Sequence, residues 1–422
     1  MTGYRVAPLR AGIDALVDVP GSKSIANRAL FCAALAEGDS VLANVPDGDD
    51  TQAMVAALRA LGLEIEVDGS RVRIGGGRSR WRPGPLRLHA GLAGTTSRFL
   101  TALCALGKGA YTIDGDAPLR ARPMVPLHEA MTALGARVRP QAAPGHLPVT
   151  VEGPFDLLAD EVTMPGDVSS QFLTALMLVA PYFTGGLRLV LSTELVSRPY
   201  VHMTAAIMAD FGVPAVEVGN RIIVVPAGRY APQRYTVEPD ASSAGYPLAA
   251  AAICGGRATV SGLTSASIQG DANFCHVLAR MGCSVTQDDE ATTVMRSGPL
   301  RGLAIDMVEM SDMVPTLAAV AAFAEGSTEI HGVGFIRNKE SDRLSDLCAE
   351  LRRAGVGAVA TANGLEITPA PMQTATLATH HDHRLAMAFA LLGLGASGIV
   401  VDDPEVVSKS WPGFWDMIEG LR

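Results

Sequence analysis

Residues 29–45, ALFCAALAEGDSVLANV, join an Ala/Leu-rich run to a glycine and then to a short β-rich segment. A continuous apolar run is typical of a buried helix, the glycine ends that helix, and the β-branched residues favour a strand. The same order of segments occurs five more times. The six copies are residues 29–45, 99–115, 172–192, 247–263, 315–333 and 384–401.

The repeat accounts for nearly the whole chain, because its glycines recur at intervals of roughly 70 residues. In the first five copies a second helix ends in a Leu/Met-x-x-x-Gly pattern, followed by another strand. Each copy therefore predicts an α/β unit, with roughly twelve helices in all. A chain of 422 residues exceeds one ordinary core, so we expect two domains of three units. A TIM barrel is the alternative, but it needs about eight simpler βα repeats. The marker glycines are Gly38, Gly107, Gly186, Gly256, Gly326 and Gly398.

Composition excludes several classes of protein. Hydrophobic residues make up 48% of the chain and charged residues 18%, which is typical of a well-packed globular protein. The net charge of −9 argues against a nucleic-acid partner, since no basic stripe is present. We also expect no membrane span, no signal peptide and a cytoplasmic location. The six scattered cysteines are expected to be buried free thiols, without a metal or a disulfide.

Unusual polar residues cluster where helices are expected to begin. Helix starts carry unpaired backbone N–H groups and a partial positive charge, so they attract anions. Ordinary capping explains many of the Ser, Thr, Asp and Asn residues there. It does not explain cations, which oppose the helix dipole unless an anion joins them, and we therefore predict a polyanionic ligand. The cations concerned are Lys23, Arg28, Arg98, Arg122, Arg343, Arg384 and Lys409.

Taken together, these motifs resemble those of the 5-enolpyruvylshikimate-3-phosphate (EPSP) synthases, a family of enolpyruvyl transferases. The resemblance runs in order along about 390 residues. The motifs are PGSKS-x-x-NR, AGT, RPM, SSQ, DASSA, NKESDR, DHR and SKSWP. The family fold that this implies is a two-domain inside-out α/β barrel, with six βαβαββ-like units, three per domain. The inserted domain would span 21–237, and 1–20 would join 238–422 in the second.

The resemblance also implies which residues bind the two substrates. Arginine forks match carboxylate and phosphate groups bidentately, and a glycine lets the backbone approach closely. For shikimate 3-phosphate, the implied residues are Lys23, Ser24, Arg28, Ser169, Ser170, Gln171, Ser197, Tyr200, Asp312 and Lys339. For phosphoenolpyruvate, they are Lys23, Gly94, Arg122, Gln171, Arg343, Arg384 and Lys409.

The implied reaction needs two proton movements, and the implied catalytic residues are Lys23, Asp312, Glu340 and His383. Asp312 would contact the 5-hydroxyl of shikimate 3-phosphate, while Lys23 and Glu340 are acid/base candidates at the methylene carbon of phosphoenolpyruvate. The resemblance leaves open which group makes each transfer. We expect no metal ion or organic cofactor, a monomer, and these two small molecules as partners.

Some positions depart from the commonest family pattern, and other acceptors remain open. Leu92 stands where many members carry Asn, which puts the affinity of the family inhibitor glyphosate in doubt. A related transferase that uses a UDP-sugar is one alternative, but Ser24 and the segment 117–119 differ from its motifs. A transferase recruited to specialised metabolism and a non-catalytic binding protein are the others. The combination of Lys23, Asp312, Glu340 and Arg384 argues against the last.

Overall fold

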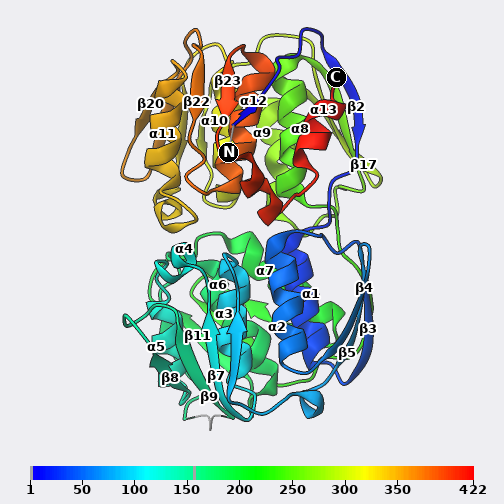
Figure 1. The fold of residues 1–422 in the computed structure, drawn as a ribbon, viewed down its shortest axis with the longest axis vertical. Helices are drawn as coiled ribbons and strands as arrows, with labels where there is room; N and C mark the ends of the chain where they lie inside the picture. The colour runs from blue at the N-terminus through cyan, green and yellow to red at the C-terminus, as the bar shows by residue number, and fades with distance from the viewer. Residues whose placement is uncertain (1–2, 155–157) are drawn as a thin grey trace. The chain divides into compact units, whose positions relative to one another are not determined.

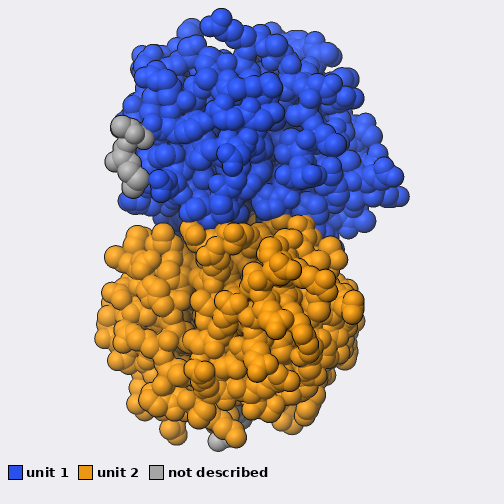
Figure 2. Space-filling view, turned by 45° about the vertical axis from the view of Figure 1, so that its right-hand side comes forward, with its two compact units in different colours: residues 1–20, 238–422 blue, residues 21–237 orange. Residues whose placement is uncertain are grey.

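The computed structural model describes residues 3–154 and 158–422. The chain forms two compact units, coloured separately in Figure 2: unit 1 comprises residues 1–20 and 238–422, and unit 2 comprises residues 21–237. Each unit is built from three copies of one α/β motif, and in Figure 1 the helices of each unit run alongside one another with sheets towards the outside.

Unit 2 contains the first three repeats. Its elements are α1 (Lys23–Leu35), β3 (Gly38–Ala43), α2 (Asp49–Ala60), β4 (Glu64–Asp68), β5 (Arg71–Gly76), η1 (Arg78–Arg80), β6 (Leu86–His89), α3 (Gly94–Cys104), β7 (Gly109–Asp114), α4 (Ala117–Arg120), α5 (Val125–Ala133), β8 (Arg137–Pro140), β9 (Val149–Gly153), β10 (Glu161–Met164), α6 (Ser170–Val179), η2 (Ala180–Tyr182), β11 (Leu187–Leu191), α7 (Arg198–Asp210), β12 (Glu217–Val218), β13 (Ile222–Val225) and β14 (Arg234–Thr236).

Unit 1 contains the other three repeats. Its elements are β1 (Tyr4–Arg5), β2 (Ile13–Val17), α8 (Ala241–Cys254), β15 (Gly256–Ser261), η3 (Gly270–Asn273), α9 (Phe274–Arg280), β16 (Ser284–Gln287), β17 (Ala291–Arg296), β18 (Ala304–Asp306), η4 (Ser311–Met313), α10 (Val314–Ala321), β19 (Thr328–His331), η5 (Gly334–Asn338), α11 (Arg343–Arg353), β20 (Gly357–Ala360), β21 (Gly364–Thr368), β22 (Ala375–Leu377), α12 (His383–Gly395), β23 (Ile399–Val401), η6 (Pro404–Lys409) and α13 (Phe414–Gly420).

The sheets repeat one topology. In the second repeat, for example, β6 and β7 are parallel and are joined through α3, whereas β9 pairs antiparallel with both β7 and β8. The sheet order is therefore β6-β7-β9-β8, and four other sheets among the described residues have the same pattern. In the sixth repeat the sheet has three strands in the order β1-β23-β22, and β1 pairs antiparallel with β23. The predicted α/β organisation in six repeats is confirmed.

The first helix of each repeat is buried on nearly all sides. Residues 25–35 of α1, 241–253 of α8 and 383–394 of α12 are all buried. This explains their sequences, because a helix that is apolar around its whole circumference is stable only inside the protein. The second helices end as predicted: Gly62, Gly135, Gly212, Gly282 and Gly355 follow them with φ values from +89° to +108°.

The cysteines are free thiols, as predicted from their apolar surroundings. Five of the six are buried and Cys254 is partly buried. Burial raises the pKa of the Cys254 and Cys275 thiols to about 11, so both stay neutral at physiological pH. In the described part of the chain, no helix is long and apolar enough to cross a membrane.

Candidate functional site

In unit 2 the starts of three helices are tied together around Lys23. Lys23 is the first residue of α1, and its Nζ donates to Oδ2 of Asp50 at 2.9 Å. Asp50 is buried in the first turn of α2. The hydroxyl of Thr96, near the start of α3, donates to the backbone oxygen of Asp50 at 3.1 Å. Asp50 therefore holds Lys23 at the shared end of these helices, and the sequence analysis did not select it.

Arg28 lies one turn further along α1 and is fully buried. Its Nε donates to the Thr204 hydroxyl at 2.8 Å and its Nη2 to the Thr174 hydroxyl at 3.3 Å. The backbone oxygens of Ser24 and Tyr200 accept from its other N–H groups. Burial among these neutral groups lowers the pKa of Arg28 to about 10, where it is still a cation at neutral pH.

A second cluster surrounds Gly94, the first residue of α3. A methyl group placed there would lie 2.9 Å from Nη1 of Arg122 and 2.9 Å from Nη1 of Arg98. Arg98 also donates to the side-chain oxygen of Gln171 in α6, and it lies over the Phe172 ring. Gly94, Arg122 and Gln171 are thus brought together as a cationic pocket. Arg98 belongs with them, although it was selected only as a cation near a helix start.

The serines predicted to bind phosphate lie at the starts of α6 and α7. Ser169 caps α6 by accepting a hydrogen bond from the Gln171 backbone at 3.3 Å, and Ser170 begins the helix. Ser197 precedes α7 and is buried in a left-handed conformation with φ +53°. Tyr200 lies in the first turn of α7 and forms a cation–π contact with Arg28. Helix starts favour an anion, because their backbone N–H groups and partial positive charge lie there.

In unit 1 Arg343 is the centre of a carboxylate cluster. Its side chain is 1% exposed, and its Nε donates to Asp382 at 2.7 Å. Its Nη2 donates to Glu340 at 2.7 Å and its Nη1 to Asp312 at 3.0 Å. Burial lowers the Arg343 pKa, but these carboxylates outweigh it and raise the pKa above its ordinary value.

Asp312 is shared by three cations. Besides Arg343, it accepts from Arg384 Nη2 at 2.7 Å, and Lys339 Nζ lies 3.8 Å away. Burial raises the Asp312 pKa, but Arg384, Lys339 and Arg343 together hold it well below its usual range. The sequence-predicted residues Asp312, Lys339, Glu340, Arg343 and Arg384 therefore form one continuous cluster in unit 1.

The turn before α12 connects this cluster to the helix. Asp382 is fully buried and caps α12 by accepting from the Arg384 backbone at 2.9 Å. His383 is buried beside it, with Nδ1 3.7 Å from an Asp382 oxygen. Lys409 is buried at the end of η6. The sequence analysis quoted Asp382 only as part of the DHR motif, whereas the structure shows that it pairs with the Arg343 side chain and accepts from the Arg384 backbone.

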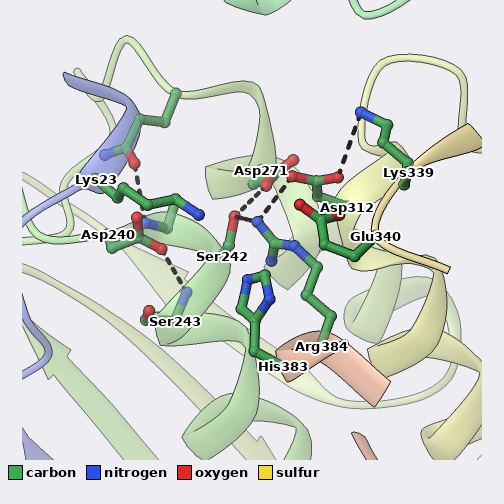
Figure 3. Close-up of polar contacts among 12 residues, drawn as sticks. Lys23, Asp240, Ser242, Ser243, Asp271, Asp312, Lys339, Glu340, His383 and Arg384 are labelled. Atoms are coloured by element: carbon green, nitrogen blue, oxygen red, sulfur yellow. Dashed lines mark hydrogen bonds and ion pairs between the residues drawn. The ribbon is translucent and has the colours of Figure 1, made fainter. Parts of the chain in front are cut away.

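Figure 3 shows a further carboxylate, Asp271, that is linked to Arg384 through Ser242. Arg384 Nη2 donates to the Ser242 hydroxyl at 3.3 Å, and that hydroxyl donates to Asp271. Burial and Asp312 raise the Asp271 pKa to about 6, although Arg384 lowers it. Ser242 and Asp271 lie in the motifs DASSA and QGDANF, ahead of helices in one repeat. Their position in that pattern was the available signal, but neither was predicted as a site residue.

The fold and these clusters define a class: a six-repeat α/β protein that gathers cations and carboxylates at its helix starts. Such groups can bind phosphate and carboxylate ligands and move protons beside them. Within residues 3–154 and 158–422, no group of three or more His, Cys, Asp or Glu side chains is arranged to hold a metal ion.

Comparison with known proteins identifies the family. Residues 10–418 match the EPSP synthase family, described as 3-phosphoshikimate 1-carboxyvinyltransferase. The chain is 41% identical to the 3-phosphoshikimate 1-carboxyvinyltransferase of Nostoc punctiforme, over 98% of each chain. It therefore belongs to the EPSP synthase family.

Solved structures agree with this assignment. The structure of EPSP synthase from Acinetobacter baumannii is similar with a TM-score of 0.83 and 26% identity, covering 100% of this chain and 98% of that one. The enolpyruvyl transferase NikO from Streptomyces tendae has a TM-score of 0.79 at 20% identity, covering 99% of this chain and 98% of that one. At that identity the likeness extends to the fold alone.

Proposed function

We propose that the protein transfers the enolpyruvyl group of phosphoenolpyruvate to the 5-hydroxyl of shikimate 3-phosphate and releases phosphate, a step in the synthesis of chorismate and the aromatic amino acids. Family membership supports the reaction. The observation that carries it is the cluster around Asp312, which accepts hydrogen bonds from Arg343 and Arg384, while Arg343 also donates to Glu340. This set supplies both anion binding and proton transfer.

Shikimate 3-phosphate would bind mainly through neutral donors of unit 2. Its phosphate suits the starts of α6 and α7, where backbone N–H groups lie beside serine hydroxyls. Its ring and carboxylate would meet the cationic start of α1, and its 5-hydroxyl the Asp312 cluster. The proposed contacts are Lys23, Ser24, Arg28, Ser169, Ser170, Gln171, Ser197, Tyr200, Asp312 and Lys339.

Phosphoenolpyruvate would bind through charged groups. The backbone at Gly94 lies beside the guanidinium groups of Arg98 and Arg122, which could pair with phosphate oxygens. In unit 1, Arg343 and Arg384 could exchange part of their pairing with Asp312 for pairing with the substrate carboxylate. The proposed contacts are Lys23, Gly94, Arg122, Gln171, Arg343, Arg384 and Lys409.

The chemistry would proceed in two steps. The 5-hydroxyl oxygen bonds to the central carbon of phosphoenolpyruvate and loses its proton, while the methylene carbon gains a proton and becomes a methyl group. The carbon–oxygen bond to phosphate then breaks as the methyl group returns a proton. Lys23 and Glu340 are the proposed partners at the methylene carbon, and His383 is a further candidate that lies close to Asp382.

The low pKa of Asp312 limits its role in the empty protein. A carboxylate held strongly in its charged form orients a hydroxyl group well but accepts its proton poorly. An anionic substrate on Arg343 and Arg384 would neutralise the charges that depress the Asp312 pKa. Substrate binding would therefore raise this pKa and make Asp312 a better base.

A phosphate-release assay with both substrates tests the proposed reaction. We expect release only when both are present, and loss of release in Glu340→Gln. A UDP-sugar in place of shikimate 3-phosphate serves as the competing acceptor. Release with the UDP-sugar but not with shikimate 3-phosphate would show that the acceptor is wrong.

We further propose that the enzyme acts as a cytoplasmic monomer without a metal ion, since cations of the chain supply the positive charge. Turnover should survive exhaustive chelation and dialysis. Activity that is lost and then restored only by a divalent cation would contradict this.

A further inference from the structure

Asp271 is a buried carboxylate that the proposed reaction does not use. It lies in η3 and is 5% exposed. Its Oδ2 accepts from the Ser242 hydroxyl, which in turn accepts from Arg384 Nη2 at 3.3 Å. The same Arg384 nitrogen donates to Asp312 at 2.7 Å, so the two carboxylates share one guanidinium group, one directly and one through Ser242 (Figure 3).

The loop that carries Asp271 is fixed to the start of α8. The Gln269 side chain accepts from the Ala241 backbone at 3.0 Å. Its amide nitrogen donates to Glu238 at 2.9 Å and to the Pro239 oxygen at 2.8 Å. Because Asp271 is buried on an anchored loop, it cannot easily turn towards water when the charge around it changes. The remaining way to adjust is to gain or lose a proton.

The charged groups around Asp271 act in opposite directions. Burial, Asp312 and Asp240 raise its pKa, while Arg384 and the Ser242 hydrogen bond lower it. On the packed helix α9, the Cys275 thiol donates to the Ala272 oxygen and stays neutral. Among these influences, Arg384 is the one that most favours the charged form of Asp271.

We propose that Asp271 takes up a proton from solvent when an anionic substrate binds Arg384, and that this uptake sets the pH dependence of phosphoenolpyruvate binding. The inference rests on the proposed function, because it assigns phosphoenolpyruvate to Arg384. Asp312 also lies beside Lys339, whereas Arg384 is the largest of the influences that favour the charged form of Asp271.

The linkage follows from charge. An anion bound to Arg384 offsets the positive charge that favours the charged form of Asp271. The anion also places a second negative charge near Asp271, which disfavours the charged carboxylate. One proton then moves from solvent to the Asp271 carboxylate, and no other bond changes. When the pH is above the pKa of Asp271, binding of phosphoenolpyruvate requires Asp271 to take up a proton from solvent. Binding therefore weakens as the pH rises. Below it, the proton is already present and binding has no such cost.

The test compares Asp271→Asn with the wild-type enzyme at saturating shikimate 3-phosphate. The measured quantity is kcat/KM for phosphoenolpyruvate from roughly pH 5 to pH 8.5, and the ratio of variant to wild type cancels the titration of the substrate itself. We expect the ratio to rise across this range by about tenfold, the effect of one pKa unit. Asp14→Asn is the control, because Asp14 is exposed and pairs with Arg257 on β15.

Each outcome is decisive. Absence of phosphate release by the wild type would remove the proposed function itself. Two results would overturn the proton uptake alone, given normal phosphate release by the wild type. One is a ratio of kcat/KM values that does not change with pH, and the other is a ratio that changes equally for Asp14→Asn.

If Asp271→Asn does not fold, infrared difference spectra of the wild type replace it. Adding phosphoenolpyruvate at neutral pH should produce the carbonyl band of a protonated carboxyl group. The band should shift in Ser242→Ala, which removes the hydrogen-bond partner of Asp271. No band, or a band unaffected by Ser242→Ala, would contradict the proposal.

Discussion

Arg28 in unit 2 and Arg343 in unit 1 are both buried arginines near the start of a helix, but they are held in opposite ways. Among the described residues, Arg28 donates only to hydroxyl and backbone oxygens, whereas Arg343 donates to three carboxylates. The first arrangement leaves a net positive charge for an anionic ligand. The second is already neutralised, so a ligand must compete with carboxylates for the guanidinium group.

The difference assigns separate work to the two arginine clusters. The neutral partners of Arg28 keep a site ready for the charge of a substrate, which is suited to binding. Carboxylates in unit 1 have pKa values that depend on the cations they share, as the opposite shifts of Asp312 and Asp271 show. Groups whose pKa values are pushed apart by their surroundings are suited to proton transfer.

The largest expected effect is on the kinetics of two variants, one at the proton-transfer candidate Lys23 and one at the neutral binding residue Ser197. Lys23→Ala should lower kcat by about 100- to 10,000-fold, because general acid–base groups contribute that much. Ser197→Ala removes one neutral hydrogen bond, so it should raise the KM for shikimate 3-phosphate by about tenfold or less and leave kcat nearly unchanged. Steady-state kinetics decide between them. Indistinguishable kinetics for the two variants would remove the assigned roles.

The next comparison replaces each buried arginine by methionine. Arg343→Met removes a cation from three carboxylates, of which Asp382 is fully buried, so it should destabilise the protein by about 3–5 kcal/mol. Arg28→Met leaves hydroxyls that still bond to each other, since the Thr174 and Thr204 oxygens lie 3.0 Å apart. We expect a loss of about 1–2 kcal/mol there. Chemical denaturation measures both, and equal losses would show that the two environments do not differ as described.

Asp271 gives a pH-dependent prediction for the empty protein. Its folded pKa of about 6 lies above the ordinary value of about 3.9. The contribution of Asp271 to stability is therefore fully present when the pH is below its unfolded pKa. That contribution is lost as the pH rises through its folded pKa. Asp271→Asn should gain about 2–3 kcal/mol relative to wild type between pH 4 and pH 8. Thermal melts across this range test it, and a constant difference in Tm would contradict it.

The sequence predicted the fold well because short stretches of neighbouring residues determine each helix and each turn of the repeat. Ala/Leu-rich runs require buried helices, and the repeated glycines have positive φ values. The single departure in the count of α-helices among described residues is α4, a four-residue helix outside the repeat. Nothing in the repeat pattern separates these four residues from an ordinary loop.

The site was harder to predict, because most of its contacts join residues that are far apart in the chain. Lys23 and Arg343 could be selected as cations without a capping role, but their partners Asp50 and Asp382 resemble ordinary acidic residues at helix starts. Asp271 is 41 residues from Asp312 in the sequence and acts on the same arginine through a serine. Only the tertiary fold shows such a connection.

The smallest expected effect concerns glyphosate, which we expect to compete with phosphoenolpyruvate in the cationic pocket beside Gly94. A methyl group on Gly94 would lie 2.9 Å from one nitrogen of Arg122 and one of Arg98. Both atoms are ends of flexible side chains, so the protein should fold while the pocket narrows. Glyphosate is longer than phosphoenolpyruvate and should fill the pocket more completely. Gly94→Ala should therefore raise the inhibition constant about tenfold more than it raises the KM for phosphoenolpyruvate, a difference of about 1.4 kcal/mol.

Leu92 provides the control for this prediction. It is 37% exposed, just before α3, and its side chain cannot donate a hydrogen bond. Leu92→Asn should tighten glyphosate binding if the inhibitor lies beside this segment, and it leaves Gly94 unchanged. Inhibition measured at several phosphoenolpyruvate concentrations separates the outcomes. Noncompetitive inhibition in the wild type, or an inhibition constant that Gly94→Ala does not change, would show that glyphosate does not occupy the pocket between Arg98 and Arg122.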